Sequence, residues 1–256
     1  MKFAVISPGY SATDWAMFSI GSVLGQVNAD LYHIIIDDGF KTDIGKYYFY
    51  LTDNFPIYWK STAEKRGALA SHLDAMNHLK DLEDRKSNKA LKDTDIIVHL
   101  DLDDWLLTPF ALQRIKKEYE NGAWATYGNY LATNGENSVC KPYNKKFNRK
   151  TDTFHWFFSH LRTFRYGLWK HIRPDALLDR DGIPFKMAGD VAICSSILEL
   201  CPVDKVHFIK DPLMVYNRMT PFNENKMNIQ LQQDCVKQII SKEPHLELTD
   251  AEFIHP

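Results

Sequence analysis

The sequence predicts an α/β fold in which a mostly parallel sheet is flanked by helices. Apolar runs of strand length alternate with longer amphipathic stretches through the first half of the 256-residue chain. Such alternation favours a parallel sheet, because parallel strands are joined by crossovers that place helices on both faces. Two of the apolar runs end in aspartate clusters. Strand ends face the ligand crevice in open α/β sheets, so the clusters also predict where a site lies.

Apolar periodicity, turn residues and capping residues predict the elements in order. Runs bounded by polar turns predict strands at 3–6, 31–36, 56–59, 95–100, 123–130, 206–209 and 213–216. Amphipathic stretches predict helices at 13–26, 64–80, from 109 onward, at 186–200 and at 223–240. Thr13 and Asp14 can cap the first of these helices. Residues 81–94 are polar and charged, and they indicate a loop or a frayed helix end.

The bulk composition fits a soluble enzyme. Charged residues make up 25% of the chain, and the net charge of −2 gives no global attraction to polyanions. No apolar run approaches the roughly 20 residues of a membrane span, so no span is expected. Residues 1–6 indicate a first strand rather than a signal peptide. The four cysteines include no Cys-x-x-Cys pair, which argues against structural zinc and favours reduced thiols in a cytoplasmic protein.

The two aspartate clusters are the candidate site. The run Leu31–Ile36 ends in Asp37-Asp38-Gly39, and the run Asp95–Leu100 ends in Asp101-Leu102-Asp103-Asp104. Five carboxylates gathered at strand ends repel one another unless a cation or a donor-rich ligand compensates them. A divalent metal with a nucleotide diphosphate supplies both, because hard cations take oxygen ligands and bridge phosphate oxygens. The clusters therefore predict a nucleotide-activated substrate and Mn²⁺ or Mg²⁺ as the cofactor.

A basic segment occupies residues 141–173. It holds nine Lys and Arg against one acid, Asp152, and aromatic residues are interleaved with them. A local charge of +8 on an otherwise acidic chain suits a phosphate-bearing ligand. The alternative is a solvated loop followed by a helix that packs its aromatic side chains into the core.

Three motifs carry a resemblance to a known family. They are Ser19–Gln26, His33–Gly39 and His99–Asp104, and in order and spacing they resemble the nucleotide-binding half of family 2 glycosyltransferases. The resemblance implies the GT-A fold and inversion at the anomeric carbon. It implies a nucleotide-sugar-binding half at residues 1–130. Residues 131–256 would then be the acceptor-binding and catalytic-base half of the same domain.

Two further segments refine the resemblance, and two positions depart from it. Residues 160–165 and 215–218 are similar to a soluble subgroup found in bacteria and bacteriophages. The usual Pro-x-Tyr-Asn after the first strand appears only as Ser7-Pro8-Gly9-Tyr10. The usual Glu-Asp before the base helix appears as Gly189-Asp190.

The resemblance assigns residues to the nucleotide and the metal. Asp38 would accept from the uracil imide, although an aspartate in an Asp-Gly turn is often only a cap. Asp101 would meet the ribose or the metal, Asp103 would bind the metal directly, and Asp104 would support either or cap the turn. The full nucleotide-binding set is Ser7, Pro8, Asp37, Asp38, Arg66, Asp101 and Arg218. An exposed arginine at a helix start is the alternative for Arg66.

The resemblance also assigns a base and an acceptor site. Asp190 is the candidate general base, which must take the acceptor hydroxyl's proton opposite the departing diphosphate. The alternative is a helix-start aspartate favoured by the helix dipole. Asp179 and Asp181 are the fallback bases. The acceptor-binding set is His160, Arg162, Arg165 and Trp156. His160 and Arg218 would also reach the diphosphate.

These expectations describe a metal-dependent, inverting hexosyl- or pentosyltransferase that uses a UDP-sugar and a hydroxyl acceptor. The first acceptor considered is a bacterial surface glycan or its lipid-linked precursor. The alternative is hydroxymethylated pyrimidine in bacteriophage DNA, which the basic aromatic segment favours and the overall charge opposes. A nucleotidyltransferase is a further alternative, but no Gly-rich basic loop follows the first strand. The last alternative is a non-catalytic protein that binds a nucleotide-sugar.

Overall fold

The computed structural model describes residues 1–10, 12–39, 48–136, 138, 140–152, 157–220 and 228–254. Within these ranges one eight-stranded sheet has the order β3-β2-β1-β4-β7-β6-β8-β5. Its strands are β1 (Lys2–Gly9), β2 (Asp30–Asp38), β3 (Ile57–Thr62), β4 (Ile96–His99), β5 (Trp105–Leu106), β6 (Ala125–Ala132), β7 (Arg162–Arg165) and β8 (Val206–Tyr216).

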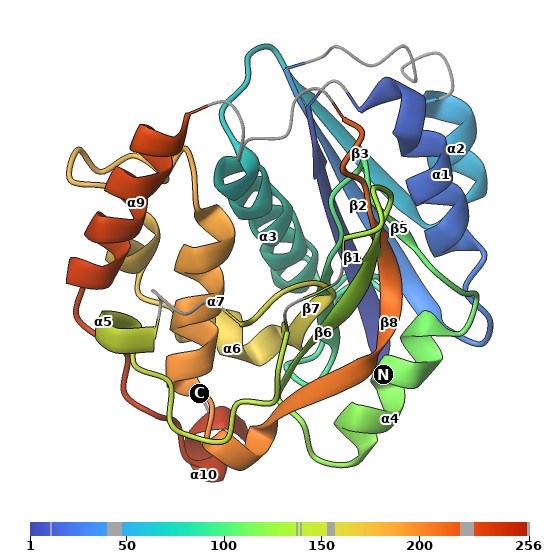
Figure 1. Cartoon of the computed structure of the whole chain (residues 1–256). Helices are drawn as coiled ribbons and strands as arrows, with labels where there is room; N and C mark the ends of the chain where they lie inside the picture. The colour runs from blue at the N-terminus through green and yellow to red at the C-terminus, as the bar shows by residue number, and fades with distance from the viewer. Residues whose placement is uncertain are drawn as a thin grey trace.

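Helices cover both faces of the sheet (Figure 1). They are α1 (Thr13–Leu24), α2 (Tyr48–Asn54), α3 (Ala68–Asp84), α4 (Ala111–Glu120), α5 (Arg149–Asp152), α6 (Tyr166–Lys170), α7 (Gly189–Leu200), α9 (Ile229–Ser241) and α10 (Asp250–Ile254), with 3₁₀ turns η3 (Pro174–Leu177) and η4 (Val203–Lys205). Helix α3 packs on β1 and β2, with α7 and α9 outside it, whereas α2 contacts β3 and α1 contacts β5. In the described ranges no helix has the length and apolar character needed to cross a bilayer.

The sheet is parallel in one part and antiparallel in another. Strands β3, β2, β1 and β4 are parallel to one another, as the βα alternation predicts. Strand β7 then pairs antiparallel with both β4 and β6, and β5 pairs antiparallel with β8. Four of these seven pairings are parallel, counting the β6–β8 pairing, so the predicted fold class is confirmed as a mixed sheet.

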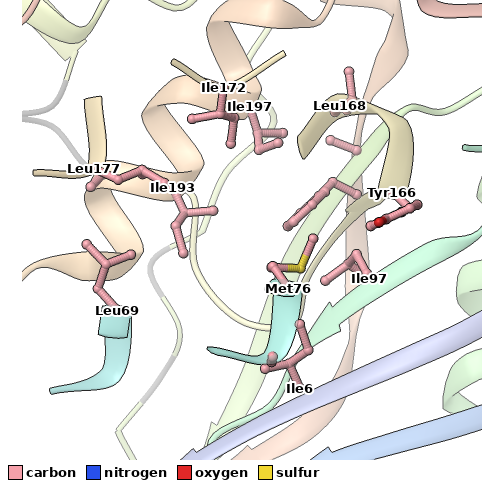
Figure 2. Close-up of a cluster of buried hydrophobic side chains, with 14 of the residues drawn as sticks. Ile6, Leu69, Met76, Ile97, Tyr166, Leu168, Ile172, Leu177, Ile193 and Ile197 are labelled. Carbon is pink, nitrogen blue, oxygen red and sulfur yellow. The ribbon is translucent and has the colours of Figure 1, made fainter. Parts of the chain in front are cut away.

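Alternation along the central strands builds two cores. Ala4 and Ile6 of β1 face α3 and α7, whereas Phe3 and Val5 face α4. Successive strand side chains point to opposite faces, which is why a continuous apolar run is needed here. Figure 2 shows the first of these cores, where Ile6 of β1 meets side chains of α3, α6 and α7.

Several boundaries differ from the sequence prediction, three of them at α3 and β8. The helix expected from residue 64 begins at Ala68, because Gly67 adopts φ 97° and its N–H is bound by Asp38. The same helix runs on to Asp84, into the segment expected to be a loop. The two strands expected at 206–209 and 213–216 are one strand, β8, with a register shift opposite Gly128 and Asn129.

Candidate active site

The ends of the central strands border a cleft of about 310 Å³. Strands β1, β2, β4, β7 and β8 contribute residues at or near their ends, and helices α3 and α7 contribute their first turns. The predicted site residues in its lining are Pro8, Asp38, Asp101, Asp103, His160, Arg162, Asp190 and Arg218. The fold therefore brings residues from both halves of the sequence to one place.

Asp38 ends β2 and anchors the connection that leads into α3. Its carboxylate accepts the backbone N–H groups of Arg66 at 3.0 Å and Gly67 at 2.7 Å. The side chain of Arg66 pairs with Asp74, and its Nε also lies 3.8 Å from Asp38 Oδ1. Arg66 is not part of the cleft lining, whereas Lys65 is. Arg66 therefore holds Asp38 through its backbone N–H and its guanidinium, and its nucleotide contact stays a prediction.

Ser7 and Asp37 are buried outside the cleft lining. Ser7 Oγ hydrogen-bonds His33 Nε2 at 2.9 Å, and burial lowers the pKa of His33 to about 3. Asp37 precedes Asp38 on β2, so its side chain points to the other face of the sheet when that of Asp38 points to the cleft. Their predicted nucleotide contacts are therefore not supported by their positions.

In the second aspartate cluster, Asp101 and Asp103 line the cleft, whereas Asp104 is buried. Leu102, between Asp101 and Asp103, is fully buried. A side chain at position 9 would meet Leu102 Cβ at 2.6 Å, so Gly9 lets β1 approach this loop closely. Asp104 Oδ1 accepts the N–H of Asn217 at 2.8 Å, which ties the loop to the end of β8.

The donor set fits a divalent cation shared with a diphosphate. Burial and the neighbouring charges of Asp103 and Asp101 raise the pKa of Asp104 well above its usual range. Among the residues that the structure describes, no three His, Cys, Asp or Glu side chains are gathered to hold a metal alone. Magnesium-type sites commonly take one or two carboxylates and complete the shell with substrate phosphates, a pattern that Asp101 and Asp103 match.

Asp190 lines the same cleft from the first turn of α7. Its Oδ2 is 2.9 Å from Nη2 of Arg162, and its side chain is 41% exposed. The fallback bases are placed elsewhere: Asp179 accepts the N–H groups of Asp181 and Ile183 in a turn, and neither aspartate lines the cleft.

Sequence reasoning missed two histidines in the lining. The rings of His72 and His99 lie 4.3 Å apart. Burial lowers the pKa of His72 to about 4, and burial with nearby positive charge lowers that of His99 well below 6.5, so both are neutral at pH 7. The sequence could have indicated His72, because it lies three residues after Leu69 and four before Met76, on the apolar face of α3 where a histidine is unexpected.

Three other predicted residues have distinct outcomes. Arg218 lies over the ring of Tyr216, 4.5 Å from its centroid, and lines the cleft. Arg165 does not, because its guanidinium binds the carbonyls of Thr94, Tyr119 and Ala123 on the other side of β7. Its position outside the cleft lining does not support the predicted acceptor contact. Trp156 lies outside the described residues.

The basic segment is tied to the protein's own acids and carbonyls. Arg149 is fully buried and pairs with Glu199, and Lys146 binds the carbonyls of Glu199 and Cys201. Lys145 pairs with Asp152, and Lys170 pairs with Glu83 and Asp93. Most of these partners lie far along the chain, so a count within the segment overstates its free charge. The predicted anion-binding patch is not supported.

Arg149→Met is expected to lower the free energy of unfolding by about 3–5 kcal/mol, because it leaves buried Glu199 without its guanidinium. The double change Arg149→Met with Glu199→Met should cost clearly less. Urea unfolding of the wild type, both single variants and the double variant measures this. An equal loss of unfolding free energy in the single and double variants would show that the unpaired charge of Glu199 does not cause the destabilisation.

Comparison with known proteins gives a structural match only. No protein-family model matches the chain, and no curated protein matches its sequence. Among solved structures, residues 1–349 of S. aureus TarS in complex with UDP-GlcNAc match with a TM-score of 0.65 and 13% identity, over 99% of this chain and 69% of that one. The same TarS segment without that ligand matches with a TM-score of 0.64 and 14% identity, over 99% and 68%.

A TarS structure of greater length matches with a TM-score of 0.60, and this chain spans 41% of it. Likeness at such low identity is likeness of fold. The chain has the GT-A-like fold. The eight-stranded mixed sheet flanked by helices is thereby placed among known architectures, and the cleft lies at the strand ends where open sheets bind ligands.

Proposed function

We propose that this protein is a metal-dependent inverting glycosyltransferase that moves a sugar from a UDP-sugar to a hydroxyl acceptor. The observation that carries the proposal is one cleft that gathers Asp38, Asp101, Asp103 and Asp190 at the strand ends of a GT-A-like sheet. The TarS structures in complex with UDP-GlcNAc and with UDP support a uridine nucleotide as the donor.

Different residues of the cleft are assigned to the uracil, the ribose and the diphosphate of the donor. Asp38 is the acceptor for the uracil imide, since its strand-end carboxylate is held rigidly by two backbone N–H groups. Asp101 is assigned to the ribose, and Pro8 supplies a wall beside it. Arg218 and Lys65 place positive charge in the lining, where an anionic diphosphate needs it.

Asp103, with Asp101, would hold Mn²⁺ or Mg²⁺. When bound, the cation neutralises the charge that develops on the leaving diphosphate. Two carboxylates at one strand end, with no third protein ligand gathered among the described residues, leave room for phosphate oxygens in its coordination shell.

Asp190 is the general base. Its carboxylate is 41% exposed and lines the cleft from helix α7 rather than from the strand ends that carry Asp38 and Asp101. A base there takes the proton of the acceptor hydroxyl while the acceptor oxygen attacks the anomeric carbon. A single displacement of this kind inverts the anomeric configuration.

For the acceptor we favour a bacterial surface glycan or its precursor over modified bacteriophage DNA. The DNA version depended on a free basic segment, and Lys145, Arg149 and Lys170 of that segment are paired with the protein's own acids. A cytoplasmic location is proposed from the four cysteines, which are all buried and unpaired thiols.

A thermal-shift screen tests the donor. UDP and UDP-GlcNAc with Mn²⁺, at about 100 times their dissociation constant, are expected to raise the melting temperature by roughly 5–10 °C. GDP and CDP should do less, and EDTA should remove most of the shift. UDP-xylose against UDP-GlcNAc separates pentosyl from hexosyl donors. Stabilisation by UTP alone would favour a nucleotidyltransferase, and no shift with any uridine nucleotide would refute the proposal.

A further inference from the structure

Arg162 is a buried arginine in the lining of the cleft. It begins β7, opposite His99 of β4, and its side chain is only 10% exposed. Its Nη2 lies 2.9 Å from Asp190 Oδ2 and donates to His160 Nε2 at 3.1 Å. Burial opposes a charged guanidinium there, but the charges of Asp190 and Asp101 outweigh it and raise the pKa of Arg162.

His160 holds the guanidinium in one orientation. A guanidinium has no acceptor, so His160 Nε2 must accept the bond and the ring proton sits on Nδ1. Burial, Arg162 and Arg218 lower the pKa of His160 well below 6.5, so the ring is neutral at pH 7. The ring stacks on Tyr216 at 5.1 Å and meets Tyr130 edge-on. Packing thus fixes the imidazole, and the imidazole fixes Nη2 of Arg162.

The two oxygens of Asp190 are therefore in different surroundings. Oδ2 is held by Arg162, whereas Oδ1 has no hydrogen bond to the part of the chain that the structure describes, on a side chain that is 41% exposed. We propose that Arg162, oriented by His160, is a positioning residue that holds Asp190 Oδ2 and leaves Oδ1 to take the acceptor's proton. This inference rests on the proposed function and changes the role first expected of Arg162 and His160 as acceptor contacts.

The step balances without a further reactant. The acceptor O–H bond breaks, its proton moves to Asp190 Oδ1, and the acceptor oxygen bonds to the anomeric carbon. The anomeric bond to the diphosphate breaks, and its electron pair leaves with UDP. Asp190 becomes neutral in this step, while Arg162 keeps its charge and its place beside Oδ2.

A double-mutant cycle tests this arrangement, with UDP release from UDP-GlcNAc in Mn²⁺ as the assay and water as the acceptor. Arg162→Gln is expected to lower kcat roughly 10- to 100-fold with little change in donor KM, because Asp190 loses the ion-pair partner of its Oδ2. In the Asp190→Asn background the same change should cost less than about 2-fold, because an effect that acts through Asp190 disappears with it.

Three more variants separate positioning from folding. His160→Phe keeps a ring on Tyr216 but offers no acceptor, and it should lose activity as Arg162→Gln does. His160→Gln keeps an acceptor oxygen and should recover part of that loss. Arg165→Gln is the matched control on the same strand: its contacts are all to backbone carbonyls, so the melting temperature should fall while kcat stays unchanged.

Equal losses from Arg162→Gln with and without Asp190, or a raised donor KM, would make Arg162 a substrate contact and overturn the inference. A wild type that binds UDP-GlcNAc but releases no UDP would also contradict it, because Asp190 would then activate no water. If UDP fails to stabilise the wild type at all, the proposed function itself fails. Stabilisation by UDP with additive losses would remove only the role given to Arg162.

Discussion

Asp103→Asn is expected to lower UDP-sugar turnover by about 10²- to 10³-fold and to remove the metal-dependent part of UDP binding. Asp103 lines the cleft beside Asp101, and an amide cannot supply the charge that a hard divalent cation prefers. Loss of the cation leaves the departing diphosphate without electrostatic stabilisation, which is commonly the largest single contribution to such reactions. The measurement is UDP release across a Mn²⁺ titration.

Asp104→Asn is the matched control. Asp104 is buried, its pKa is raised well above the usual range, and its Oδ1 accepts the N–H of Asn217. An asparagine is nearly isosteric with aspartate, and its Oδ1 can still accept the N–H of Asn217, so activity and melting temperature should fall much less than in Asp103→Asn. Normal turnover by Asp103→Asn in Mn²⁺, or an equal loss in Asp104→Asn, would contradict the assignment of Asp103 to the metal.

Asp190→Asn is expected to lower turnover by about 10²- to 10⁴-fold, the usual range for losing a general base. Donor affinity should stay near wild type, because Asp190 lies on α7, away from the β2 and β4 ends that would hold the nucleotide. Calorimetric titration with UDP-GlcNAc and an assay of UDP release measure the two effects separately.

The matched control for the base is Asp179→Asn, which alters an aspartate of the same segment that caps a turn outside the cleft. Its turnover should be unchanged. NMR of the product of the wild-type reaction should show the anomeric configuration opposite to that of the donor. A retained configuration would exclude a single displacement with Asp190 as the base.

The strand-end acids could be predicted because their positions follow from local pattern. A buried run such as Ile34–Ile36 fixes the alternation of side chains, and the residue just beyond it reaches the edge of the sheet. The same pattern shows why only one member of each neighbouring pair reaches the cleft: Asp38 does and Asp37 does not. The Asp-Asp-Gly motif alone does not show whether Asp37 or Asp38 faces the cleft, because both are acids in adjacent positions.

Strand β7 could not be predicted, because its four residues read as part of a basic loop. Arg162 and Arg165 are its first and last residues, and charged residues are untypical of a central strand. Pairing with β4 and β6 decides its structure, and that pairing is non-local. The same non-local partners, Asp190 for Arg162 and Glu199 for Arg149, turn apparent surface charge into internal ion pairs.

A crystal structure with UDP and Mn²⁺, recorded near the manganese absorption edge, tests the central claim most directly. We predict an anomalous peak beside Asp103 that also contacts the diphosphate, with the uracil ring at Asp38 inside the cleft. Manganese bound away from Asp101 and Asp103, or UDP bound outside this cleft, would contradict the account.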